Sequence, residues 1–160
     1  VWNLDDDKSK VLEGHTDIVR NAVFNPDGTH IVTASEDGTA RVWNLDDGTS
    51  KVLEGHTDIV LSASFSPYSN LIITSSKDET ARIWDLLGRE VQVFEEHRGA
   101  ISQAQFTPDG KQAVSIAFDG TVRVWPVDDL DSLLEKACER LKHYLQNSSE
   151  VSEEDRGICG

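Results

Sequence analysis

The chain has 160 residues, of which 38% are hydrophobic, 28% charged and 7% aromatic. This apolar content is too high for a disordered polymer, and no apolar run approaches the roughly 18–20 residues that a membrane-spanning helix needs. Because 29 Asp and Glu stand against 15 Lys and Arg, the formal net charge of −14 repels phosphate backbones and anionic lipids, so we expect neither nucleic acid nor a membrane as partner.

A repeat of 41 residues runs through the first four-fifths of the chain. The nonapeptide VLEGHTDIV occurs at residues 11–19 and again at 52–60. Three residue types keep the same interval, at Trp2, Trp43, Trp84 and Trp125, at His15, His56 and His97, and at Asp37, Asp78 and Asp119. A period of about 40–45 residues with strand-like content is typical of β-propeller blades, each a four-stranded antiparallel sheet. The repeat therefore predicts an all-β fold.

Residues 1–14 are interpreted as part of a blade whose first half is absent. Residues 1–4 have the pattern of the end of a third strand, and Ser9–Glu13 has that of a fourth strand. Because the chain begins with Val1 and contains no Met, we expect it to be the C-terminal part of a longer propeller, with the remaining blades in the same chain. The alternative is that two or three copies join into one composite ring, since open blade faces and unpaired strand edges drive association.

The first complete unit covers about residues 15–54 and contains four predicted strands. Residues that favour strands mark them at Ile18–Phe24, His30–Ser35, Thr39–Leu45 and about Ser50–Glu54. The sequence Asn25-Pro26-Asp27-Gly28 between the first two strands is typical of a hairpin connection, because Pro presets φ and Gly accepts positive φ. The other two turns are predicted at Glu36-Asp37-Gly38 and Asp46-Asp47-Gly48.

Two further units follow, at about residues 55–95 and 96–127. They repeat the turns of the first unit, except that Glu79 replaces a turn glycine in the second. A non-glycine residue at a position that needs positive φ costs roughly 1 kcal/mol. The third unit has no predicted fourth strand, because a different pattern begins directly after Val127. Three and a half blades cannot close a ring alone, since propellers have about 4–8.

Residues 128–160 form a separate C-terminal segment in which we predict an amphipathic α-helix of about five turns. Apolar residues recur there at helical spacing, at Leu130, Leu133, Leu134, Ala137, Leu141, Tyr144 and Leu145. We expect the apolar stripe to dock on the propeller or on a neighbouring domain; the alternative is a helix for oligomerisation or for binding a partner. Cys138 and Cys159 form no disulfide framework and are too few for structural zinc. We therefore predict no metal site and a reducing, cytoplasmic location.

Three dipeptides carry a resemblance to a known family. Gly14-His15, Gly55-His56 and Trp84-Asp85 make residues 1–127 resemble the WD-repeat β-propellers. Glu96 departs from the pattern, because it stands where the glycine of the third Gly-His pair is expected. The C-terminal segment is similar to the ends of large bacterial WD-repeat proteins, especially cyanobacterial ones. Many of those carry an N-terminal signalling NTPase or kinase, so the resemblance implies a sensor or interaction arm of a larger signalling protein.

The resemblance implies a hydrogen-bonded tetrad inside each blade, made of the His, the tight-turn Asp, a Ser or Thr of the second strand and the Trp of the third. By motif position the tetrads are His15, Thr33, Asp37 and Trp43; His56, Thr74, Asp78 and Trp84; and His97, Ser115, Asp119 and Trp125. Such buried groups must pair with one another, because each unpaired one costs about 1–3 kcal/mol. A catalytic constellation is needed once, whereas this set occurs three times. We therefore predict no catalytic residues and no cofactor.

The resemblance also implies a peptide-binding top face, made of residues at the start of each first strand and of the residue before each tight-turn Asp. These positions are Ile18, Arg20 and Glu36; Ile59, Leu61 and Lys77; and Ala100, Ser102 and Phe118. Its apolar members are anchors of the kind that binding hot spots need. The predicted function is a non-enzymatic scaffold that binds a protein or peptide. The alternative is a structural module that oligomerises to complete a propeller from several chains.

Overall fold

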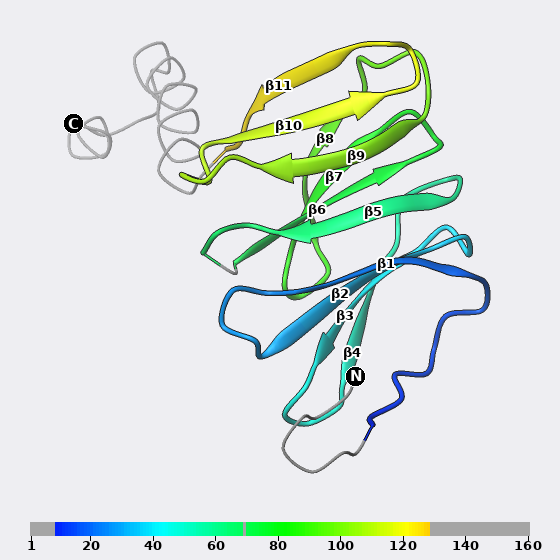
Figure 1. Cartoon of the computed structure of the whole chain (residues 1–160), viewed down its shortest axis with the longest axis vertical. Coiled ribbons are helices and arrows are strands. Elements are labelled where there is room, and N and C mark those ends of the chain that lie inside the picture. The colour runs from blue at the N-terminus through cyan, green and yellow to red at the C-terminus, as the bar shows by residue number, and fades with distance from the viewer. Residues whose placement is uncertain (1–8, 69, 129–160) are drawn as a thin grey trace, which may run out of the picture. The chain divides into compact units, whose positions relative to one another are not determined.

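The computed structural model describes residues 9–68 and 70–128, which form three antiparallel β-sheets (Figure 1). The sheets belong to the first of the two units into which the chain divides, residues 1–127 and 128–160. The predicted C-terminal helix, Trp2, Cys138 and Cys159 lie outside the described residues. Within the described ranges the all-β prediction is confirmed, and no helix there has the length and apolar character of a membrane span.

Each sheet takes its strands in chain order, and we name the sheets blades 1 to 3. Blade 1 contains β1 (Val19–Phe24), β2 (His30–Ser35), β3 (Ala40–Asn44) and β4 (Ser50–Leu53). Blade 2 contains β5 (Val60–Phe65), β6 (Leu71–Ser76), β7 (Ala81–Asp85) and β8 (Glu90–Phe94). Blade 3 contains β9 (Ile101–Phe106), β10 (Gln112–Ala117) and β11 (Val122–Pro126), and in the described part of the chain no fourth strand pairs with β11.

The predicted strand at Ser9–Glu13 is wrong, because residues 10–15 lie in no strand. Its sequence is identical to that of Ser50–Glu54, which contains β4, so the local preference for a strand is the same in both segments. The two segments differ in whether a neighbouring strand is available to pair with them. A strand needs a partner for its backbone hydrogen bonds, and in blade 1 β3 already pairs with β2 and β4.

Neighbouring blades pack against each other through two apolar clusters, and their first strands β1, β5 and β9 lie side by side (Figure 1). The first cluster joins blades 1 and 2 and includes Val32, Val42, Leu53, Val60, Phe65 and Trp84. The second joins blades 2 and 3 and includes Ile73, Ile83, Phe94, Ile101, Ala104 and Trp125. Each fully buried aliphatic side chain contributes roughly 1.5–3 kcal/mol, so contact between blades is a main source of stability.

The tight turn between the second and third strands of each blade contains a residue with positive φ. Gly38 and Gly120 have φ of 80°, and Glu79 has φ of 68° at the equivalent place in blade 2. Glycine adopts this backbone conformation without steric cost, whereas other residues pay roughly 1–2 kcal/mol. Glu79 therefore adopts the positive φ that this turn was predicted to need, and its backbone is strained as a result.

We expect Glu79→Gly to raise the free energy of unfolding by about 0.5–1 kcal/mol, because relief of the strain exceeds the entropy that glycine gains in the unfolded chain. The matched control is Gly120→Ala, where a Cβ would meet nothing within 4 Å, so only backbone strain is added. That variant should be less stable by about 1 kcal/mol. Urea unfolding measures both changes, and a shift of the two variants in the same direction would contradict this account.

Candidate functional site

A chain of side-chain hydrogen bonds crosses the interior of blade 2. The indole Nε1–H of Trp84 donates to the hydroxyl of Thr74 at 2.8 Å. That hydroxyl lies 2.7 Å from Nε2 of His56, and Nδ1 of His56 lies 2.8 Å from Oδ2 of Asp78. Because a carboxylate only accepts, His56 donates from Nδ1 and its Nε2 accepts the Thr74 hydroxyl proton. All donors and acceptors along the chain are therefore satisfied.

The same chain recurs in the other two blades with nearly equal geometry. In blade 1 the Trp–Thr, Thr–His and His–Asp distances are 2.9, 2.7 and 2.8 Å. In blade 3, where a serine replaces the threonine, the corresponding distances are 2.8, 2.7 and 3.0 Å. The structure thus brings together the predicted tetrads His15, Thr33, Asp37 and Trp43; His56, Thr74, Asp78 and Trp84; and His97, Ser115, Asp119 and Trp125.

The aspartate at the end of each chain accepts two further bonds from a threonine that the sequence analysis missed. In blade 2 the backbone N–H and the hydroxyl of Thr80 donate to Oδ1 of Asp78 at 3.0 and 2.7 Å. Thr39 and Thr121 do the same for the aspartates of blades 1 and 3. Their spacing of 41 residues is the signal that would have identified them.

Burial and hydrogen bonding act in opposite directions on the pKa of Asp78. Burial disfavours the charged carboxylate and raises the pKa, but the bonds from His56, the Thr57 N–H and Thr80 lower it further than burial raises it. The pKa of Asp37 is likewise lowered against the effect of burial by its hydrogen bonds, that from Thr39 foremost. In blade 3 the Thr121 hydroxyl is the main cause of the lowered pKa of Asp119. The three aspartates are therefore charged in the folded chain at neutral pH.

The tetrads are closed to any substrate. Thr74 and Ser115 are fully buried, and Thr33 is only 6% exposed. Each of these hydroxyls already accepts an indole N–H, so a nucleophilic role would require the blade to open. In the described ranges no group of three His, Cys, Asp or Glu side chains is arranged to hold a metal ion. The arrangement serves to hold strands and loops together.

The tetrads hold the predicted top face in place. Oδ2 of Asp78 also accepts the backbone N–H of Thr57 at 3.0 Å, which ties the loop before β5 to the tight turn. One backbone bond then joins the two predicted positions in that loop and turn, from the Lys77 N–H to the Ile59 carbonyl at 2.9 Å. The equivalent bonds join Glu36 to Ile18 and Phe118 to Ala100, both at 2.9 Å.

The remaining predicted top-face position of each blade, near the start of the first strand, lies at a β-bulge. The pairing of first and second strands skips one residue between Val19 and Asn21, between Val60 and Ser62, and between Ile101 and Gln103. The skipped residues are Arg20, Leu61 and Ser102. A bulge leaves one residue out of the ladder and re-aims its side chain. The pattern of the sequence did not reveal these bulges, but they fall at predicted top-face positions in all three blades.

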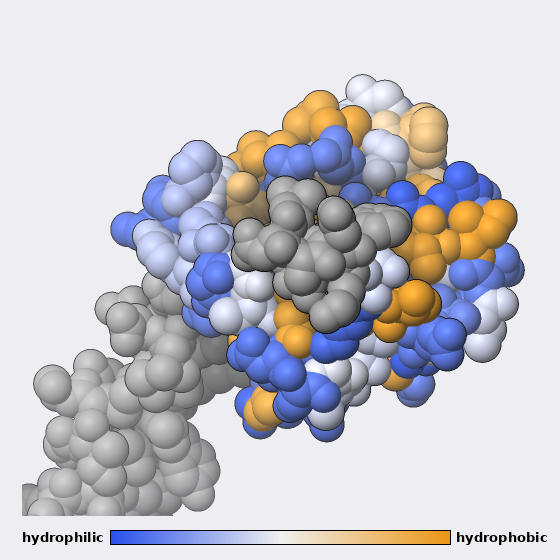
Figure 2. All heavy atoms as spheres, turned by 60° about the horizontal axis from the view of Figure 1, so that its bottom comes forward, coloured by the Kyte–Doolittle hydropathy of each residue, from blue (hydrophilic) through white to orange (hydrophobic). Residues whose placement is uncertain are grey.

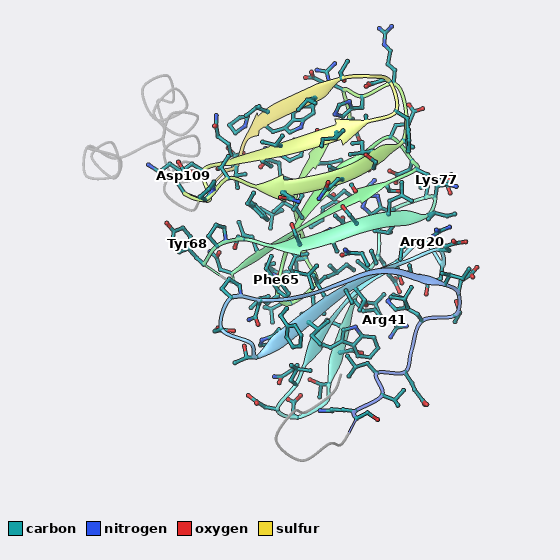
Figure 3. The ribbon with its side chains drawn as sticks, in the orientation of Figure 1. Arg20, Arg41, Phe65, Tyr68, Lys77 and Asp109 are labelled. Carbon is teal, nitrogen blue, oxygen red and sulfur yellow. The ribbon has the colours of Figure 1, made fainter. Side chains whose placement is uncertain are left out.

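The top face presents both apolar and charged side chains. Phe118 and Ile18 are 76% and 59% exposed. Arg20 forms an ion pair with Glu36, and Lys77 is exposed at the same end of the sheets as Arg20 (Figure 3). The remaining members, Ile59, Leu61, Ala100 and Ser102, are half-buried. Tyr68 and Asp109 lie at the opposite end of the sheets (Figure 3).

Comparison with protein families gives a match over most of the chain. Residues 7–44, 48–85 and 88–126 match the WD40 family, described as WD domain, G-beta repeat. Curated proteins yield no match to the chain.

We expect Asp78→Ala to lower the free energy of unfolding by about 2–4 kcal/mol, because it leaves the donors of His56, Thr57 and Thr80 without an acceptor. The matched control is Asp46→Ala, at an exposed turn outside the tetrads. It should change stability by less than about 0.5 kcal/mol. Chemical denaturation followed by tryptophan fluorescence distinguishes the two variants, and equal small effects would show that the network contributes little.

Stability should fall as the pH drops below about 4. The folded pKa values of the three tetrad aspartates lie below the unfolded value of about 3.9. Their contribution is therefore complete above that value and is lost as the pH falls toward the folded pKa values. Urea titrations between pH 7 and 3 should show this slope, and Asp78→Asn should make it shallower. An unchanged slope in that variant would exclude Asp78 as one of its sources.

Proposed function

Because the chain belongs to the WD40 repeat family, whose members generally act as scaffolds for protein–protein interaction, we propose that it binds a protein or peptide through its top face. One observation supports this most directly. In each of three blades the same bulge and the same backbone bond present three side chains at one end of the sheet, anchored by a buried tetrad. The tetrad residues repeat from blade to blade with a single change of Thr to Ser, whereas the presented residues differ at every equivalent position except Ile18 and Ile59. Side chains that vary while the backbone and the tetrads that hold them stay the same are suited to binding a specific partner.

The chemistry of the face favours a partner with both apolar and charged groups. Phe118 and Ile18 supply exposed apolar surface, and burial of such side chains is the main source of binding energy at hot spots. Lys77 and the ion pair of Arg20 with Glu36 add charge next to it. Polar groups of this kind orient a ligand more than they raise its affinity.

The proposal is for a non-catalytic role. It is supported by the burial of the tetrad hydroxyls, and WD40 repeat domains are typically non-catalytic scaffolds. We further place the chain in the cytoplasm of a bacterial cell, as the sensor or interaction arm of a signalling protein. The support for that setting is the acidic composition, the low cysteine content and the resemblance of the C-terminal segment.

A second candidate function is assembly with other blades to complete a propeller. It is favoured by the terminal blades, whose outward faces carry exposed Phe24, Val122 and Val124 at 54%, 62% and 56%. The two functions are compatible, because the top face lies at the ends of the strands and the blade faces lie along them.

Peptides selected from a displayed random library on the immobilised full chain should bind through the top face. We expect Phe118→Ala combined with Leu61→Ser to weaken their binding by about 10-fold or more, because truncated hot spots cost about 2 kcal/mol or more. The matched control is Tyr68→Ala, which removes a 70% exposed aromatic side chain from the opposite end of the sheets (Figure 3). Full binding by the double variant, or an equal loss in both variants, would contradict the top-face proposal.

A further inference from the structure

A groove of about 310 Å³ crosses the first strands of all three blades, β1, β5 and β9, which lie side by side (Figure 1). Two equivalent positions of the repeat supply its polar side chains, which are Asn21 in blade 1, Ser62 and Ser64 in blade 2, and Gln103 and Gln105 in blade 3. The volume lies at the small end of the range of about 300–1,000 Å³ that ligand pockets occupy. The groove is therefore of a size for a small molecule and not for a folded partner.

The described residues that line the groove carry no charge. Charged residues make up 28% of the chain, and hydrophilic residues cover much of the surface that Figure 2 shows. An ion that left water for a lining of amides, hydroxyls and apolar groups would lose hydration without gaining an ion pair. The lining therefore favours a neutral ligand.

Gln103 and Gln105 offer hydrogen-bonding groups that the protein itself does not use. Both side chains are exposed, and neither forms a hydrogen bond within the described ranges. In blade 1 the side chain of Asn21 is held in place, because its Oδ1 accepts the Ala63 N–H at 3.2 Å, and its Nδ2 remains as a donor. A carboxamide has both donors and an acceptor, so it can pair with hydroxyl groups, which donate and accept.

The backbone carbonyl of Ala63 points toward the same groove. Hydrogen bonds alternate along an antiparallel pair, and the Ser66 N–H donates to the Leu71 carbonyl. In the register of β5 and β6 this places Ala63 at a position whose N–H and C=O both point away from β6. The N–H is accepted by Asn21. The carbonyl has no donor among the described residues, although Ala63 is only 2% exposed.

The equivalent carbonyl in blade 3 does have a donor. The Ala104 N–H is accepted by the hydroxyl of Ser62 at 3.3 Å, and the Ala104 carbonyl accepts the hydroxyl of Ser64 at 3.4 Å. Val23 stands in blade 1 at the position of Ser64 and has no hydrogen to donate. The unpaired carbonyl of Ala63 is therefore specific to this place, and a hydroxyl of a ligand would satisfy it.

The groove also contains two aromatic rings at equivalent positions. Phe65 and Phe106 are the last residues of β5 and β9, and both line the groove. Phe65 is almost fully buried and Phe106 is half-buried, so their rings form a fixed apolar surface beside the amides. A sugar ring has the matching character, because its C–H groups are apolar while its hydroxyls both donate and accept hydrogen bonds.

We propose that this groove binds a neutral saccharide of one or two rings. Gln103 and Gln105 bind its hydroxyls, and one further hydroxyl donates to the carbonyl of Ala63. The C–H face of the sugar packs on Phe65 and Phe106. None of the lining residues is a top-face position, so the saccharide site is distinct from the proposed peptide site.

Titration of the full chain with glucose, maltose and cellobiose, followed by saturation-transfer NMR, tests the proposal. We expect at least one of these sugars to bind and glucuronate to bind several-fold more weakly than glucose, because the lining offers its carboxylate no counter-charge. Gln103→Leu combined with Gln105→Leu should weaken binding by about 10-fold or more, since each lost hydrogen bond lowers affinity by about five-fold.

The matched control is Gln112→Leu, which alters an exposed glutamine of β10 outside the groove and should bind like the wild type. All three altered side chains are exposed, so the variants should stay folded, which tryptophan fluorescence checks. Absence of binding to all three neutral sugars would overturn the saccharide site. Equal binding by the double variant and the control would overturn its location.

The contact with the Ala63 carbonyl has a test of its own. Val23→Thr keeps the shape of the side chain but adds a hydroxyl where Ser64 has one in the next blade, so the protein itself can donate to the carbonyl. We expect sugar binding to weaken by about five-fold. Val23→Ala, which adds no donor, is the matched control and should bind more tightly than Val23→Thr. Equal binding by these two variants would overturn the carbonyl contact, and none of these outcomes bears on peptide binding at the top face.

Discussion

The structure depends on the need to satisfy a tryptophan indole N–H buried in the middle of each blade. A serine or threonine hydroxyl accepts it, a histidine accepts that hydroxyl's proton, and an aspartate accepts the histidine's. The chain of bonds runs from the third strand through the second strand to the loop before the first strand. It ends at the tight turn. One polar relay therefore links four segments through their side chains, in addition to the backbone bonds between them.

This constraint separates the residues that stabilise the blades from the residues of the proposed binding face. The relay and the apolar clusters between blades are closed to solvent and repeat with little change. The side chains at the bulges and tight turns are held by them but differ between blades, from Arg20 to Leu61 to Ser102. Side chains of the proposed binding face can therefore be exchanged without disturbing the support beneath them.

Features that depend on the local sequence were predicted better than features that depend on contacts with distant residues. The interval of 41 residues predicted the strands in equivalent places of each blade, because each blade solves the same packing problem. The tetrad residues came from the family resemblance, and the structure gives each set a chain of hydrogen bonds. The bulges were missed, since no residue type marks them, and Thr39 was missed although it kept the interval. The strand at Ser9–Glu13 was wrong because a strand depends on a neighbour, which its own sequence does not contain. Exposure of Val122 and Val124 is likewise a property of what lies beside blade 3.

Hydrogen exchange of the indole N–H groups of Trp43, Trp84 and Trp125, followed by NMR, tests the central claim most directly. The account predicts exchange slowed by about a thousand-fold or more, through opening of whole blades, because each N–H is bonded inside a closed relay. Exchange at the rate of a free indole in folded protein would contradict it, since the relay would then be open to water.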